Sequence, residues 1–134
     1  MSLISDAGTP TISDPGNILI NECIKKGINL IPVPGPSAPI ASLSISGFLD
    51  KYYFYGFFPE KNSEIKKNFE ILSKLNSSIV FFISAKKLTK SVDILKKYFL
   101  DREILVAKEI TKFYEEFFRY KIEYLDTKSI NLKG

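Results

Sequence analysis

Histidine and tryptophan are missing from this chain of 134 residues, and it has a single cysteine. The absence of histidine excludes an imidazole general base, a Ser-His-Asp triad and a histidine-ligated metal. Cys23 can form neither an internal disulfide nor a thiolate metal cluster, and its place in an apolar helical pattern predicts a buried structural thiol. We therefore expect a protein without a metal, in the reducing cytoplasm.

Long apolar runs are also missing. No segment approaches the ~20 apolar residues that span a bilayer, and Asp6 with the Gly/Pro loop after it interrupts any early region that could act as a signal peptide. In contrast, phenylalanine and tyrosine are plentiful, with 11 and 7 residues, and the apolar fraction of 45% is enough to build a core. The composition predicts a cytoplasmic globular protein without a membrane partner.

Charge is distributed unevenly along the chain. Residues 1–67 carry 6 lysines and 6 acidic residues, whereas residues 68–134 carry 13 basic and 9 acidic residues and therefore all of the net charge of +4. An excess of this size permits an anionic partner such as RNA but does not require one.

The first third of the chain has the pattern of one βα unit. Residues 3–4 predict the end of a buried strand, and a helix follows that Asp14 caps and Gly27 ends. The apolar, β-branched run 28–33 predicts a second buried strand, parallel to the first. A loop, helix, glycine and strand in this order indicate a doubly wound α/β sheet.

The rest of the chain alternates between strands and amphipathic helices. A short helix over 38–45 begins after Ser37, and we place a domain junction within 34–50. Beyond it the pattern predicts strands at 52–58, 78–84, 103–108 and 115–120, and helices at 64–75 and 88–99. The last two strands are expected to form a hairpin-like arrangement.

Two special loops carry the functional signal, Ser5-Asp6-Ala7-Gly8-Thr9-Pro10-Thr11-Ile12-Ser13-Asp14-Pro15-Gly16 and Pro34-Gly35-Pro36-Ser37-Ala38. The first resembles the signature of the ribosomal RNA small-subunit methyltransferase I family, of the tetrapyrrole methylase superfamily. Further matches follow in the same order and spacing at residues 32–38, 46–48, 55–61, 79–82 and 106–112.

This resemblance implies a fold and a domain organisation. Residues 1–36 correspond to the remnant of an N-terminal, cofactor-binding, doubly wound α/β domain, 37–50 to a linker helix, and 51–134 to a C-terminal α/β domain of the tetrapyrrole methylase type. Members of the family carry an additional N-terminal stretch and usually one more strand after a glycine like Gly134. The chain is therefore interpreted as the C-terminal portion of such an enzyme.

The resemblance also implies a cofactor and the residues that contact it. S-adenosylmethionine is expected in a cleft between the two domains, and small residues such as Ala7 and Gly8 let the backbone approach a ligand closely. The matching positions for cofactor contact are Asp6, Ala7, Gly8, Thr9, Ile12, Ser37, Ala38, Ile83 and Ile110. From the residues alone, an ordinary βα loop braced by Asp6 and Asp14 is the alternative.

The implied reaction is 2′-O-methylation of a cytidine ribose in the small-subunit (16S) rRNA. The candidates for holding a phosphate or accepting a proton are Lys108, Glu109 and Lys112, and the candidates for contacting RNA phosphates are Lys61, Lys86 and Lys87. Family resemblance also implies a homodimer, and neither DNA nor a metal is expected. A solvent-exposed pattern of alternating charge is the alternative for residues 108–112.

One segment departs from the family pattern. Members usually have Tyr-Glu-Ser-Pro-His-Arg where this chain has Phe82-Ile83-Ser84-Ala85-Lys86-Lys87. The change removes a carboxylate and replaces an imidazole and a guanidinium with ammonium groups, which lose bidentate geometry. Two alternatives therefore stay open: a noncatalytic pseudoenzyme or fragment that binds RNA or dimerises, and a methylase of the superfamily with another substrate.

Overall fold

A computed structural model describes residues 1–126 of the chain. These residues divide into two compact units, Met1–Ala41 and a second unit that begins at Ser42. The boundary falls inside the short helix α2 (Ala38–Ser44). Gly134, after which the family resemblance places a final strand, lies outside the described residues. Within those residues, no helix has both the length and the apolar composition to cross a membrane.

The first unit is built around helix α1 (Asn17–Lys25), which agrees with the predicted helix. Gly27 ends it with a φ of 64°, as the sequence predicts. The Gly27 N–H donates to the Ile24 carbonyl at 3.1 Å and the Ile28 N–H to the Cys23 carbonyl at 2.9 Å, which is the pair of bonds of a Schellman motif. Cys23 is buried, as expected for a structural thiol.

The predicted start of α1 is wrong. The N-cap is Gly16 rather than Asp14, and no side chain caps the helix. Gly16 has a φ of 136°, a conformation that L side chains rarely adopt, and an added Cβ would meet the Leu3 Cδ2 atom at 2.9 Å. The chain therefore turns into the helix at the residue that has no side chain.

The two strands predicted in this unit are also wrong. Neither residues 3–4 nor residues 28–33 form a strand, and Ile4, Ile31 and Val33 are largely exposed. A strand requires a neighbour to receive its backbone hydrogen bonds, and neither segment pairs with another described segment. Apolar, β-branched composition alone does not supply that neighbour.

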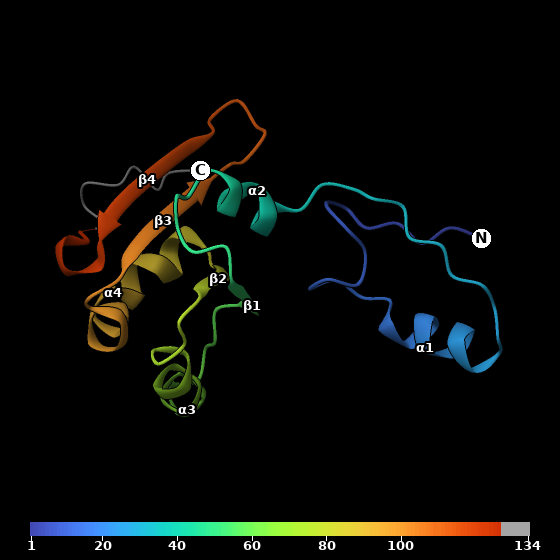
Figure 1. The fold of residues 1–134 in the computed structure, drawn as a ribbon, viewed down its shortest axis with the longest axis horizontal. Helices are drawn as coiled ribbons and strands as arrows, with labels where there is room; N and C mark the ends of the chain where they lie inside the picture. The colour runs from blue at the N-terminus through green and yellow to red at the C-terminus, as the bar shows by residue number, and fades with distance from the viewer. Residues whose placement is uncertain (127–134) are drawn as a thin grey trace. The chain divides into compact units, whose positions relative to one another are not determined.

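In the second unit, helix α3 (Asn62–Leu72) connects two parallel strands, β1 (Tyr52–Phe57) and β2 (Ser78–Phe82), which pair with each other (Figure 1). The strand register shifts between Phe54 and Gly56, and Gly56 has a φ of 89°. This irregularity at a left-handed glycine has the character of a β-bulge. Helix α4 (Ala85–Phe99) follows β2, and its N-cap residue is Ser84. The helix therefore begins three residues before the predicted range of 88–99, and Ser84 belongs to its cap rather than to the predicted strand 78–84.

The chain then forms an antiparallel hairpin, β3 (Glu103–Lys108) and β4 (Glu116–Lys121), and ends its described part with the 3-10 helix η1 (Ile122–Tyr124). The hairpin was predicted and is confirmed. The core of this unit consists of apolar residues from the loop after β1, both helices and the segment after β4: Phe58, Ile65, Phe69, Leu72, Leu88, Leu95, Phe99, Ile122 and Leu125. The predicted α/β class is confirmed.

Candidate functional site

The first special loop is a tight turn with most of its residues exposed. The Ser5 hydroxyl donates to the Gly8 carbonyl at 3.1 Å, which closes the turn, and Gly8 has a φ of 75°. Five of the residues that are predicted to contact the cofactor lie in this loop, and all five are exposed: Asp6, Ala7, Gly8, Thr9 and Ile12. Their backbone N–H groups donate to no other backbone group among the described residues.

The second special loop meets the first within the same unit. The Thr9 hydroxyl donates to the Pro36 carbonyl at 3.3 Å, and a Cβ added to Gly8 would lie 3.5 Å from the same oxygen. Ser37, which is half-buried, directly precedes α2, and its carbonyl accepts the Ala41 N–H at 2.9 Å. Ala38 is the first residue of that helix. The fold therefore brings together two segments that the sequence marks separately as cofactor contacts.

Left-handed backbone at residues other than glycine is confined, among the described residues, to two of the marked segments. Thr11 and Ser13 have φ values of 70° and 64°, and Glu109 and Thr111 have φ values of 51° and 65°. Such conformations cost roughly 1–3 kcal/mol each and cluster at functional sites. The left-handed backbone at Thr11, Ser13 and Thr111 was not predicted, since threonine and serine carry no signal for this conformation.

The catalytic candidates lie at the end of β3 and in the turn that follows it. Lys108 pairs with Glu116 at 3.2 Å across the hairpin, and its side chain is only 12% exposed. Lys112 pairs with Glu109 at 3.1 Å within the turn, where the Lys112 side chain is 66% exposed. Both candidate cations therefore already have a carboxylate partner, in two separate ion pairs.

The two predicted isoleucines differ in their surroundings. Ile83 lies between β2 and α4 and packs against the core of the second unit. Ile110 is half-buried in the turn after β3, between the two left-handed residues. Both belong to the second unit, whereas the two special loops belong to the first.

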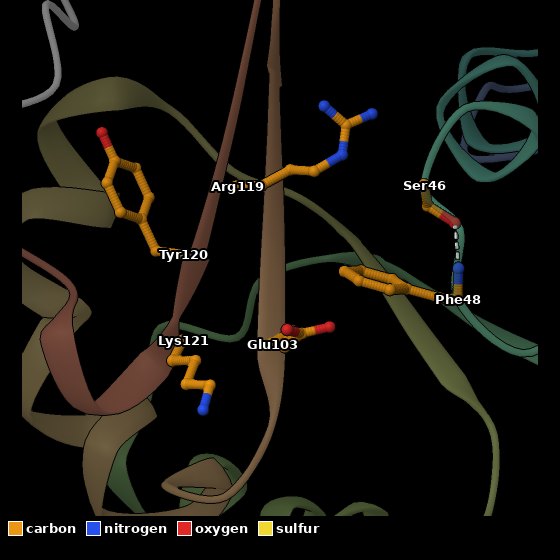
Figure 2. A pocket seen from close by; sticks show the side chains of 6 residues that line it. All are labelled: Ser46, Phe48, Glu103, Arg119, Tyr120 and Lys121. Atoms are coloured by element: carbon orange, nitrogen blue, oxygen red, sulfur yellow. Dashed lines mark hydrogen bonds between the residues drawn. The ribbon is translucent and has the colours of Figure 1, made fainter.

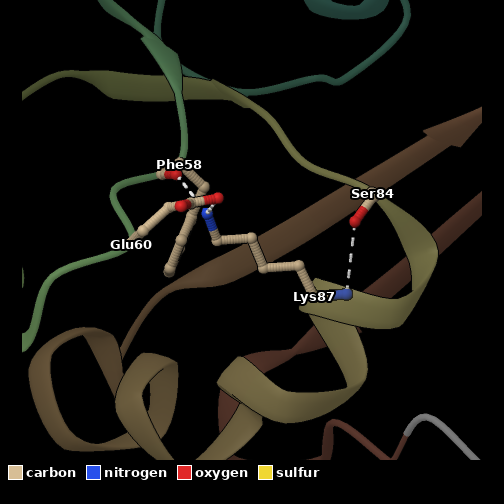
Figure 3. Close-up of polar contacts among 4 residues, drawn as sticks. All are labelled: Phe58, Glu60, Ser84 and Lys87. Atoms are coloured by element: carbon tan, nitrogen blue, oxygen red, sulfur yellow. Dashed lines mark hydrogen bonds and ion pairs between the residues drawn. The ribbon is translucent and has the colours of Figure 1, made fainter.

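The three lysines proposed to contact RNA are not equivalent. Lys61 and Lys86 are exposed and have no ion pair or side-chain hydrogen bond with a described residue. Lys87 instead reaches back to the end of β1, where its ammonium donates to the Phe58 carbonyl at 2.7 Å and pairs with Glu60 at 3.3 Å (Figure 3). Lys87 therefore has a structural contact that the sequence did not indicate.

An open pocket of about 150 Å³ lies at the end of the hairpin opposite its turn, where β3 begins and β4 ends (Figure 2). None of its residues was predicted as a site: Ser46, Phe48, Glu103, Arg119, Tyr120 and Lys121. Arg119 donates to the Ile45 carbonyl, and the Ser46 hydroxyl accepts the Phe48 N–H at 3.0 Å. The one sequence feature that could have indicated this pocket is the pair of basic residues Arg119 and Lys121, which lie two positions apart in β4 and therefore on the same face of the strand. No group of three or more potential metal ligands occurs within residues 1–126.

Comparison with known proteins identifies the family of this chain. Residues 2–126 match the family of Tetrapyrrole (Corrin/Porphyrin) Methylases. The chain belongs to this family. It is 42% identical over 121 residues to the "Ribosomal RNA small subunit methyltransferase I" of Leptospira biflexa, which covers 90% of this chain and 50% of the relative.

Other relatives give the same result. The protein of the same name from Thermotoga maritima is 41% identical over 91% of this chain and 55% of its own length, and that from Bacillus subtilis is 38% identical over 89% and 41%. The chain therefore spans about half the length of these curated relatives. The family resemblance that was inferred from the motifs is confirmed.

Proposed function

We propose that this chain is part of an S-adenosylmethionine-dependent methyltransferase that modifies small-subunit ribosomal RNA, at the 2′-oxygen of a cytidine ribose. The observation that supports it most directly is the 38–42% identity to three relatives named "Ribosomal RNA small subunit methyltransferase I". Left-handed backbone at Thr11, Ser13, Glu109 and Thr111, inside two of the segments that match the family motifs, adds to it. Strain of this kind persists where surrounding structure maintains it for a function.

The residues of the first unit fit the chemistry of the proposed cofactor. The amino acid part of S-adenosylmethionine carries a carboxylate and an ammonium group, which need backbone N–H donors and carbonyl acceptors. Residues 6–9 offer such groups at an exposed turn, and Gly8 has no side chain to cover them. Within the first unit, Asp6, Ala7, Gly8, Thr9, Ile12, Ser37 and Ala38 would hold the cofactor. Ile83 and Ile110, in the second unit, stay predicted contacts.

When bound, S-adenosylmethionine supplies a methyl group on a positively charged sulfur. We assign Glu109 to accept the proton that the ribose 2′-hydroxyl loses when its oxygen takes up the methyl group, and the neutral thioether would be the leaving group. The exposed Lys112, 3.1 Å from Glu109, is assigned to the phosphate next to that ribose. Lys108, Lys61, Lys86 and Lys87 were proposed for similar roles, and of these Lys61 and Lys86 have unengaged ammonium groups in the described structure.

Two left-handed glycines provide a matched test of the cofactor site. Gly8 and Gly27 have φ values of 75° and 64°, so replacing either with alanine imposes a similar backbone cost of about 1 kcal/mol. Only Gly8 belongs to the proposed site. Calorimetric titration with S-adenosylmethionine is expected to give micromolar binding that Gly8→Ala weakens at least about tenfold and Gly27→Ala leaves unchanged.

Methyl transfer is tested separately with isotopically labelled cofactor and small ribosomal subunits. A labelled cytidine that protects the adjacent phosphodiester from alkaline hydrolysis supports 2′-O-methylation. Cofactor binding without label in the RNA would point to another substrate of the superfamily. If neither this chain nor a longer protein that carries it binds the cofactor, the proposal is refuted and a noncatalytic protein that binds RNA or dimerises is favoured. A homodimer stays a prediction that sedimentation measures directly.

A further inference from the structure

The tip of the hairpin between β3 and β4 presents two aromatic side chains to solvent. Phe113 is 93% exposed and Tyr114 is 70% exposed. Their ring centroids lie 5.0 Å apart with the planes at 90°, so that one ring meets the face of the other by its edge. This arrangement leaves ring faces open for a planar partner.

The turn that carries these rings is fixed by its own hydrogen bonds. The Lys112 N–H donates to the Glu109 carbonyl at 2.9 Å, and the Glu115 N–H donates to the Lys112 carbonyl at 3.1 Å. The Glu115 carboxylate accepts the Thr111 N–H at 2.6 Å. With its backbone held in this way, the turn displays the two rings in a preorganised geometry, which reduces the entropic cost of binding.

We propose that Phe113 and Tyr114 bind RNA by stacking on exposed nucleobases near the site of methylation, an inference that rests on the proposed function. Single-stranded RNA is recognised through unstacked bases that pack on aromatic side chains. The rings directly follow Lys112, which carries the turn's exposed ammonium group. Glu109 and Glu116 are paired with lysines, whereas Glu115 accepts a backbone N–H and keeps its negative charge. We therefore infer that stacking of the rings, rather than the charge of the turn, supplies the affinity for RNA at this tip.

A protein partner fits this surface less well. Stable protein interfaces bury about 800 Å² on each side and use roughly 20–30 residues. Two side chains at the end of a narrow hairpin present far less than that area. They are sufficient to stack on one or two bases, which is the scale of the contact that we infer.

The absence of tryptophan from the chain makes a direct optical test possible. The variant Tyr114→Trp carries a single tryptophan at the tip, and Tyr124→Trp carries one in η1, where the replaced ring is 68% exposed. The two positions are separated by the six-residue ladder of the hairpin, about 20 Å. Single-stranded RNA of about 12 nucleotides, a length within the usual site sizes, is expected to quench the first tryptophan and leave the second unchanged.

Affinity measurements identify the contribution of the rings. Phe113→Ala or Tyr114→Ala is expected to weaken RNA binding between about fivefold and about 150-fold, the range for loss of one base stack. Tyr124→Ala should have no effect. Tyr114→Phe, which retains the ring, should preserve affinity, whereas Tyr114→Leu should not. The salt dependence of binding should stay the same in all five variants, because none of them removes a phosphate contact.

The outcomes separate this inference from the proposed function. If the protein methylates small ribosomal subunits but the alanine variants retain full affinity for RNA, the stacking inference is wrong and the proposed function stands. The inference also fails if these variants lose self-association in sedimentation while RNA binding is intact, since the tip would then be a protein contact. If no variant or parent transfers methyl groups or binds RNA, both proposals are wrong.

Discussion

Lys87 and its neighbour Lys86 allow the roles of two adjacent lysines to be distinguished by experiment. Lys87→Met removes an ammonium that donates to the Phe58 carbonyl at 2.7 Å and lies 5.8 Å from the centre of the Phe58 ring, while methionine retains most of the apolar stem. Lys86→Met removes an exposed ammonium with no partner among the described residues. The two substitutions are chemically identical and differ only in what the ammonium contacts.

The magnitude follows from these contacts. A hydrogen bond from a charged group contributes about 1.5–3 kcal/mol, and the contact with the ring adds about 0.5 kcal/mol at a partly exposed site. The pair with Glu60 adds little, because the Glu60 side chain is 88% exposed. We expect Lys87→Met to lower the free energy of unfolding by about 2 kcal/mol and Lys86→Met to change it by less than about 0.5 kcal/mol.

Urea denaturation followed by tyrosine fluorescence measures this difference, since all 7 tyrosines lie in the second unit. Lys87→Met should lower the midpoint by about 1 M without changing the slope. Glu60→Gln is the control for the ion pair and should behave like the parent protein. The reasoning is refuted if Lys87→Met is as stable as Lys86→Met, or if Glu60→Gln costs as much as Lys87→Met.

Two further predictions concern the second unit. Arg102 donates to three carbonyl groups within residues 73–77, so Arg102→Met is expected to lower the free energy of unfolding by about 3 kcal/mol. Urea denaturation measures this loss and should give an intermediate value for Arg102→Lys. A loss below about 1 kcal/mol for Arg102→Met would contradict this account. Burial raises the pKa of Tyr55 above its ordinary value of 10.0, opposed by the Asn68 hydrogen bond and reinforced by Glu64. Because the folded state favours the neutral phenol, this stability is fully present below the unfolded pKa and is lost as the pH rises through the folded pKa. The free energy of unfolding of Tyr55→Phe should therefore fall less steeply than that of the parent protein between about pH 9 and 11. The same slope in both proteins would show that a group other than Tyr55 causes the pH dependence.

Local signals in the sequence were sufficient wherever neighbours in the chain determine the structure. The apolar spacing of α3 and α4 identifies the buried faces that Phe69 and Leu95 occupy in the core. Gly27 ends α1 through its own bond to Ile24 and the bond of the next residue, Ile28, to Cys23, so the signal and the effect lie within a few residues of each other. The hairpin and the family motifs are likewise continuous in the sequence.

The same local signals failed where a distant partner decides the outcome. Residues 28–33 have the composition of a buried strand, yet they have no paired neighbour and stay exposed in the described structure. Lys87 looks like any surface lysine in the sequence, and its contact with Phe58 spans 29 positions. Arg102 gave no signal either, because the carbonyl groups that it contacts lie 25 to 29 positions away.

The sequence by itself determined the family, the α/β class, the helices and the loops in which the site is proposed, because each depends on residue types at short spacing. Only the tertiary structure joined Thr9 to Pro36 across 27 positions, gave Thr11 and Thr111 left-handed backbone and displayed Phe113 and Tyr114 at the tip of a fixed turn. These features depend on hydrogen bonds and exposure, which exist only once the chain has closed on itself.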